Sequence, residues 1–192
     1  RARERPGLLA ALRRLGSGAV CYRVSDTLAA VGVTDPELVR AAEDFWGGRF
    51  FTDEYVLHDL PTPGAVDFVG ALAAAGAVPC YLTGRDAPNM LVGTVRALQR
   101  DGFPVGTIGS RLVLKADPLD DDVAYKASVT APLAAAGTVI GAFDNEPALC
   151  NRFHAAFPEA TVVHLATAFS PDAPPLQPGI ASVPDFCALL GS

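Results

Sequence analysis

One short stretch of the sequence combines residue types that suit the binding of an anion. Thr83, Gly84 and Arg85 follow the apolar run 78–82 and precede a segment with apolar residues at helical spacing. The run predicts a short buried strand, so Thr83 should lie where that strand ends and a helix begins. A hydroxyl beside free backbone N–H groups at such a turn suits phosphate.

A second group of residues offers carboxylates and a cation. Asp144 and Glu146 follow the apolar run 138–143 and again precede a predicted helix. Carboxylate oxygens are the hard ligands that Mg²⁺ takes together with water and substrate phosphate. Lys126 lies near the start of the helix that leads into this run, where its ammonium group could neutralise a phosphate.

Each of these residues also has an ordinary structural explanation. T-G-R can be a plain strand-to-helix turn, and short motifs of this kind are weakly specific. Glu146 can complement a helix dipole, and Lys126 can be a solvated surface lysine. Asp144 is harder to explain structurally, because strands are poor places for carboxylates.

The elements that position these residues form an alternating pattern from residue 61 onward. The spacing predicts strands at 78–83, 105–108, 111–114, 138–143 and 160–165, and helices at 64–75, 87–100, 122–136 and 147–157. Such alternation is typical of parallel strands joined by helical crossovers. Residues 1–57 show only helical patterns, including a helix from Asp35-Pro36 to about Trp46 that Gly47 and Gly48 should end. We therefore expect a helical subdomain at 1–57 and an α/β core at 58–192.

Composition excludes several classes of function. The 192 residues carry a net charge of −6, which argues against a nucleic-acid surface. The sequence has no apolar run of 18 residues and no signal-peptide pattern, so we expect no membrane contact. Its four cysteines form no C-x-x-C pair and its three histidines do not cluster. Buried thiols in a reducing cytoplasm are the preferred interpretation.

Taken in order, these motifs resemble those of a known enzyme family. Y-L-T-G-R-D at 81–86, A-Y-K at 124–126 and G-A-F-D-N-E-P at 141–147 resemble the second, third and fourth motifs of the haloacid dehalogenase (HAD) superfamily. The resemblance covers about residues 61–186. It implies an α/β fold, a HAD-like Rossmann-type three-layer core with a mainly parallel sheet, plus an N-terminal helical cap. It also implies Mg²⁺ dependence and transfer of a phosphoryl group from a small phosphorylated molecule through an aspartyl-phosphate.

The resemblance also implies roles for individual residues. Thr83 would hydrogen-bond the phosphoryl group, with Gly84 and Arg85 completing the phosphate-binding segment. Lys126 would offset charge on the phosphate. Asp144 would hold Mg²⁺, and Glu146 is a weaker second candidate because its spacing departs from the family pattern. Lys115 is a rival for the role of Lys126, since L-V-L-K-A-D-P at 112–118 also resembles a third motif.

The first motif of the family, a strand ending in D-x-D-x-T that carries the nucleophile, is not found in the sequence. The best candidate, A-V-C-Y-R-V-S-D-T-L at 19–28, places Arg23 and Ser25 where the two aspartates belong. We expect D-T-L-A-A-V-G-V to be a helix and its turn, with the catalytic strand upstream of Arg1; decay of the motif is the alternative. The chain as given should then be inactive. A non-catalytic phosphate- or Mg²⁺-binding regulatory module on the same fold, or purely structural strand ends, are the competing interpretations.

Overall fold

The computed structural model describes residues 10, 13, 15, 20–107 and 109–191 of the chain. The chain divides into two compact units, residues 1–50 and 51–192. The boundary therefore lies ahead of the one that the sequence places after residue 57. No helix in the described ranges is long and apolar enough to cross a membrane.

The described part of the first unit contains two helices, α2 (Val24–Ala30) and α3 (Pro36–Phe50). Asp35 Oδ1 accepts the N–H of Glu37 at 2.9 Å, which confirms the predicted start of α3 and satisfies an N–H group that has no partner within the helix. The predicted end at Gly47 is wrong, because the helix continues to Phe50. Contacts one turn apart span the two glycines: Trp46 stacks on Phe50 with ring centroids 4.5 Å apart, and such pairs stabilise a helix.

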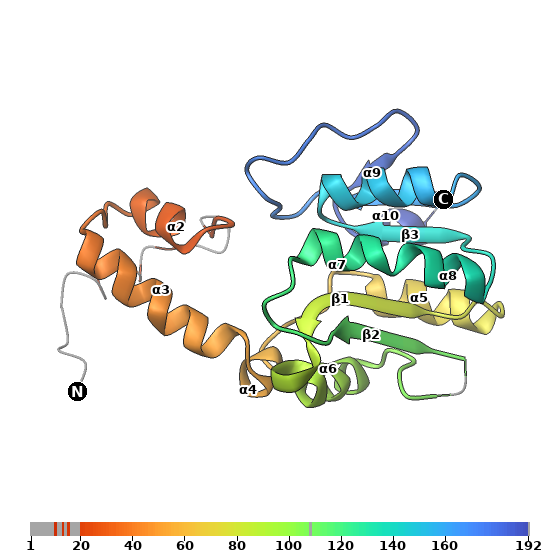
Figure 1. Ribbon diagram of the computed structural model, residues 1–192, viewed down its shortest axis with the longest axis horizontal. Helices are drawn as coiled ribbons and strands as arrows, with labels where there is room; N and C mark the ends of the chain where they lie inside the picture. Colours follow the sequence, from red (N-terminus) through yellow and green to blue (C-terminus); the bar gives the residue numbers. More distant parts are fainter. Residues whose placement is uncertain (1–9, 11–12, 14, 16–19, 108, 192) are drawn as a thin grey trace. The chain divides into compact units, whose positions relative to one another are not determined.

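The described part of the second unit holds five strands in two separate parallel sheets (Figure 1). In the first sheet β1 (Cys80–Asp86) pairs with β2 (Arg111–Lys115). In the second, β4 (Thr161–Leu165) lies between β3 (Gly141–Asp144) and β5 (Ala181–Val183). The unit is thus mixed α/β, with every strand pair parallel, as the alternating pattern predicts.

Helices cover both faces of the second sheet. The helices of this unit are α4 (Asp53–Val56), α5 (Ala65–Ala74), α6 (Ala87–Asp101), α7 (Asp122–Ser128), α8 (Thr130–Ala136), α9 (Pro147–Ala156) and α10 (Cys187–Leu190). On one face, the Phe143 ring of β3 lies 5.2 Å from the Phe68 ring of α5. On the other face, Ala142 packs against the core cluster centred on α9. The sheet is therefore the middle of three layers.

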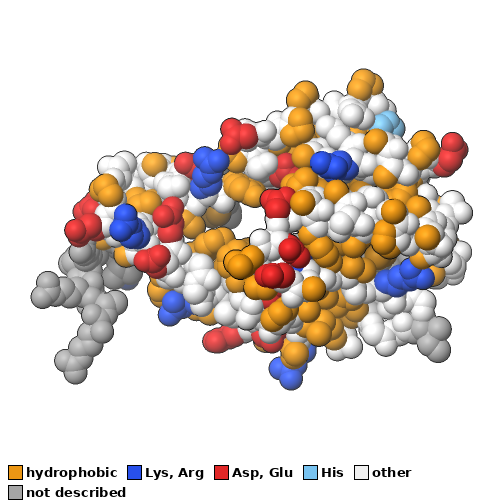
Figure 2. All heavy atoms as spheres, in the orientation of Figure 1, with side chains coloured by type: hydrophobic (Ala, Val, Ile, Leu, Met, Phe, Trp, Pro, Cys, Tyr) orange, Lys and Arg blue, Asp and Glu red, His pale blue; other side chains and the backbone are white. Residues whose placement is uncertain are grey.

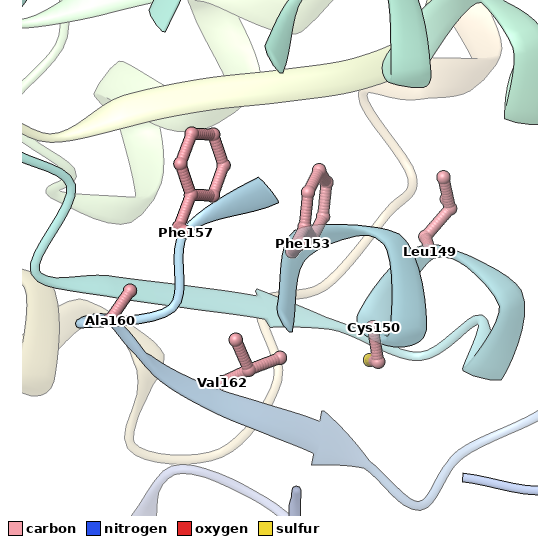
Figure 3. Close-up of a cluster of buried hydrophobic side chains, with 6 residues drawn as sticks. All are labelled: Leu149, Cys150, Phe153, Phe157, Ala160 and Val162. Atoms are coloured by element: carbon pink, nitrogen blue, oxygen red, sulfur yellow. The ribbon is translucent and has the colours of Figure 1, made fainter. Parts of the chain in front are cut away.

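The main core cluster lies between α9 and β4. It consists of Leu149, Cys150, Phe153, Phe157, Ala160 and Val162, and Figure 3 shows that Leu149, Phe153 and Phe157 project to the same side. The spacing 149, 153 and 157 places one side chain per helical turn on a single face. This apolar face fixes α9, and with it the end of β3 that precedes α9.

Three expectations about elements differ from the structure. Residues 105–107 are not in a strand, and residue 108 lies outside the described residues. The short strand β5 has no counterpart among the predicted elements. The predicted helix 122–136 is two helices that separate at Val129, because Pro132 has no N–H with which to bond the carbonyl four residues earlier.

Because the sheets are separate, β1 and β3 are no more buried than strands at the edge of a sheet. Three consecutive residues of β4 are buried, whereas β3 has none buried and β1 has only Asp86. Parallel strands with neighbours on both sides are normally buried. Large apolar side chains also remain at the surface of the second unit, such as Leu119 at 91% and Ile140 at 59% exposed, and Figure 2 shows hydrophobic atoms across the visible face. In the described chain, β1 and β3 therefore each have a ladder partner on one side alone.

Gly93 in α6 should be intolerant of a side chain, because α4 packs directly on it. A Cβ at Gly93 would lie 2.7 Å from Asp53 Cα and 2.8 Å from Asp53 C, which are backbone atoms. We expect Gly93→Ala to cost about 2–3 kcal/mol of unfolding free energy through overpacking, against a helix-propensity gain of about 1 kcal/mol. Urea unfolding followed by circular dichroism measures this.

Gly70 in the interior of α5 is the matched control for that substitution. A Cβ at Gly70 would meet nothing within 4 Å. Gly70→Ala should therefore raise the unfolding free energy by up to about 1 kcal/mol. Changes of the same sign in the two variants would contradict the described packing of α4 on α6.

Candidate functional site

The T-G-R stretch forms an irregularity at the carboxyl end of β1. Leu82 pairs with Val113 and Asp86 pairs with Lys115, so three residues of β1 oppose the single residue Leu114 of β2. β1 thus continues past Thr83, where the sequence predicts its end. Bulges of this kind re-aim side chains and are common beside functional sites.

Local contacts already engage several polar groups of the bulge. Thr83 Oγ1 accepts the Arg85 N–H at 3.2 Å. The Arg85 guanidinium donates to Asp59 at 2.5 Å and to Thr94 at 3.3 Å, so it is directed toward α6. The role of Arg85 in binding phosphate stays a prediction, and this geometry gives it a structural function.

The N-terminus of α6 already has a negatively charged cap. Asp86, 2% exposed, accepts the Asn89 N–H at 2.9 Å and the Asn89 side-chain amide at 2.8 Å. Its carboxylate complements the helix dipole. Asp86 thus already occupies the helix end that the sequence assigns to an anion, so a phosphate at this turn would be bound by the T-G-R bulge and not by the N-terminus of α6.

Lys126 and Asp144 meet as a partly buried ion pair. Lys126 Nζ lies 2.7 Å from Asp144 Oδ2, and the two side chains are 14% and 8% exposed. Asp144 Oδ1 accepts the Glu146 N–H at 2.8 Å. The structure thus brings together two of the residues that the sequence selects, 18 positions apart in the chain, at the carboxyl end of β3.

Helix α7 connects this pair to the T-G-R bulge. Asp122, its first residue, lies against Gly84, where a Cβ would be 2.6 Å from Asp122 Cγ. Lys126 follows four residues later, on the same face of the helix one turn on. The first turn of α7 therefore contacts the end of β1, and the second turn contacts the end of β3.

Lys115 faces a different set of partners. This last residue of β2 is 6% exposed, and its ammonium group donates to Pro118 O at 3.4 Å, Asp120 O at 2.9 Å and Asp122 Oδ1 at 2.8 Å. It organises the loop before α7. The geometry therefore favours Lys126 over Lys115 as the lysine beside Asp144.

The described carboxylates fit a magnesium site only in part. Glu146 accepts the N–H and hydroxyl of Ser170 at 3.1 and 2.8 Å, and both Asp144 oxygens are engaged. Among the residues that the structure describes, no three His, Cys, Asp or Glu side chains gather in a possible metal site. Because Mg²⁺ demands near-octahedral oxygen coordination, Asp144 and Glu146 do not make a complete site, and no reaction step is assigned to a metal here.

The segment considered for the first motif is not a strand where the motif would need one. α2 begins at Val24, with Arg23 as its N-cap, so Ser25 lies inside a helix. The expectation of a helix at D-T-L-A-A is confirmed. Neither Arg23 nor Ser25 is therefore at the end of a strand, where the nucleophile of the family stands.

Sequence reasoning assigned no role to Asp122 or Ser170. The signal for Asp122 was its position at the start of a predicted helix that also carries Lys126. Ser170 gave no usable signal, because its contact with Glu146 depends on how the loop after β4 folds back.

Two surface hollows lie away from the ion pair. One, of about 500 Å³, is lined by residues 134–139 and 157–159. The other, of about 230 Å³, is lined by Ala73, residues 76–79, Pro104, Thr107, Gly109 and Ser110. Both lie at the amino ends of the strands, whereas ligands of open α/β sheets bind at the carboxyl ends.

Cys150 behind the ion pair should be chemically inert in the folded protein. Burial, together with the nearby Asp144 carboxylate, raises the pKa of the Cys150 thiol to about 12. At pH 8, four units below this pKa, only about one thiol in 10⁴ is the reactive thiolate. Mass spectrometry after iodoacetamide treatment should find Cys150 unlabelled in the native chain and labelled in urea; rapid native labelling would contradict its burial.

Comparison of the chain with protein-family models, curated proteins and solved structures finds no match.

Proposed function

We propose that this chain is part of a HAD-like hydrolase that acts on a small phosphorylated molecule, with its nucleophile outside these 192 residues. The observation that carries the proposal is the partly buried Lys126–Asp144 pair at the carboxyl end of β3, connected through α7 to the T-G-R bulge of β1. The order T-G-R, lysine, aspartate along the chain is the order of the family motifs that it resembles.

The break between the sheets supports the same proposal. β1 and β3 run in the same direction (Figure 1), each has its ladder partner on one side, and α7 contacts β1 and the end of β3. Unpaired ladder edges inside a layered fold are costly. A parallel strand that carries the nucleophile, as in the resembled family, would pair with both.

In this function each residue has a defined task. The Thr83 hydroxyl donates a hydrogen bond to the phosphoryl group, aided by the backbone of Gly84. Lys126 offsets negative charge at the reacting centre, which is the main catalytic need in phosphoryl transfer. Asp144 holds Lys126 in place and, with Glu146, is the proposed source of oxygen ligands for Mg²⁺ once further ligands are present.

A regulatory module without catalysis is the second candidate. It is favoured by the pairing of Lys126 with Asp144, which neutralises both charges, and by the lack of a first motif in the sequence. Such a module would bind phosphate without turning it over. A cytoplasmic location is proposed for either candidate, because Cys80, Cys150 and Cys187 are free cysteines and thiols stay reduced in the cytoplasm.

Titration with inorganic phosphate tests the phosphate site directly. The chain contains two lysines, Lys115 and Lys126, so selective ¹⁵N-lysine labelling gives two side-chain signals. In mildly acidic buffer at low temperature, phosphate should shift the Lys126 signal saturably, whereas sodium chloride of equal ionic strength should not. A Lys126 signal unmoved by phosphate, with and without Mg²⁺, would remove the support for both candidates.

A further inference from the structure

We infer that Lys115 is a positioning residue that acts through Asp122 to place α7, and thus Lys126, at the candidate site. The effect of Lys115 on the binding of phosphate rests on the proposed function, whereas its effect on the position of α7 does not. Both lysines of the chain have largely buried side chains that pair with aspartates, and both pairs involve α7. One pair joins α7 to the end of β2, and the other joins it to the end of β3.

The environment of Lys115 indicates a holding function. Its side chain is 7% exposed, and burying an ammonium group is costly unless its hydrogen bonds are made. Lys115 has acceptors for all three N–H groups, two from backbone carbonyls of the 118–120 loop and one from Asp122. The loop and the first residue of α7 are thereby fixed to the carboxyl end of β2.

Helix α7 needs such anchors because it is short. It has seven residues, and helices of that length are not stable by themselves. Asp121 caps it by accepting the Ala124 N–H at 2.8 Å, and Asp122 lies against Gly84 of the bulge. If Lys115 released Asp122, the first turn would lose its hold on the end of β1, and Lys126 one turn later would lose its set distance to Asp144.

Lys115 also compensates a charge at the candidate site. The Asp122 carboxylate lies beside Gly84, next to the proposed position of the phosphate. Without a cation beside it, the Asp122 carboxylate would repel a phosphate bound at the T-G-R bulge. The Lys115 ammonium group, 2.8 Å from Asp122 Oδ1, offsets this charge from the buried side.

The experiment follows the Lys126 side-chain signal in ¹⁵N-lysine-labelled variants without any ligand. We expect Lys115→Met and Asp122→Asn each to speed the exchange of the Lys126 ammonium protons with water about tenfold, and the double variant to do no more, because both changes break one coupled unit. Asp101→Asn, which removes an ion pair of Arg100 elsewhere, is the matched control and should leave the signal unchanged.

Two outcomes decide the inference. An unchanged Lys126 signal in folded Asp122→Asn would overturn it, as would additive effects of the two substitutions. Asp122 is 61% exposed, so Asp122→Asn gives a folded test even if Lys115→Met fails to fold. In the phosphate titration, an unresponsive Lys126 signal would count against the proposed function. The present experiment contains no phosphate, so the two failures are distinguishable.

Discussion

We expect the 192-residue chain to hydrolyse an aryl phosphate no faster than buffer, with or without Mg²⁺. Phosphoryl transfer by this route needs a carboxylate placed in line with the leaving group. Thr83 and Lys126 can bind and offset charge, but neither can attack phosphorus. Removing the attacking group of a covalent mechanism can cost on the order of 10⁶ in kcat, so background hydrolysis should be all that a colorimetric assay detects.

A fused strand provides the positive arm of this test. An apolar strand ending in D-x-D-x-T, joined by a flexible linker ahead of residue 1, should pair between β1 and β3 and raise the rate well above background. The matched control carries Asn in place of the first Asp of that strand and should be inactive. Lys126→Met in the active fusion should lower kcat, because charge on the phosphoryl group is then not offset.

Turnover by the unextended chain would contradict this account. If that activity also disappeared in Asp144→Asn, the attacking group would have to be an aspartate of the chain, with Asp26, Asp53 and Asp86 as the candidates. Asp86 is the poorest of these, since it is buried and caps α6.

Breaking the Lys126–Asp144 pair from one side should destabilise the second unit strongly. Lys126→Met leaves the partly buried Asp144 carboxylate without its cation. Removing one partner of a fully buried pair costs about 3–5 kcal/mol, and because this pair is part-buried and Asp144 keeps the Glu146 N–H, we expect a loss at or below the lower end of that range. Urea unfolding followed by circular dichroism measures the loss. The single tryptophan, Trp46, lies in the first unit, so its fluorescence would report on the wrong part of the chain.

The double variant Lys126→Met, Asp144→Leu separates the cost of leaving one charge unpaired from the net contribution of the intact pair to the free energy of unfolding. Replacing both partners of a buried pair by apolar groups is often nearly neutral, so the double variant should recover most of the stability that Lys126→Met loses. Asp101→Asn breaks a pair at the surface, in which the Arg100 side chain is 43% exposed, and should change little, as surface pairs do. A double variant as unstable as the single one would show that packing, rather than charge, explains the loss.

The sequence by itself determined most of the local elements of the second unit and predicted the residues of the candidate site. Alternating apolar runs and helical patterns predict β1, β2, β3 and β4 and the helices between them, because apolar periodicity and capping residues act over a few positions. The selection of Lys126 and Asp144 was also possible from position alone, since each lies next to the end of a predicted element.

Local patterns failed where longer-range contacts compete with them. Gly47 and Gly48 predict the end of a helix, yet α3 continues through them to Phe50, where the stacking of Trp46 on Phe50 stabilises the last turn. The run 105–108 is apolar enough for a strand, but Val105 is buried without pairing in a sheet. Propensity is a weak signal when tertiary packing satisfies the same residues in another way.

Only the tertiary structure decided which lysine meets Asp144, where Arg85 is directed and that β1 and β3 belong to separate sheets. These facts depend on groups far apart in the chain, such as Arg85 with Asp59 and Lys126 with Asp144. Which aspartate each lysine contacts depends on how α7 and the loop before it pack. The spacing of residues in the sequence does not encode that packing. The motifs thus select the residues of the candidate site, and the packing of α7 against the ends of β1 and β3 determines how those residues are arranged.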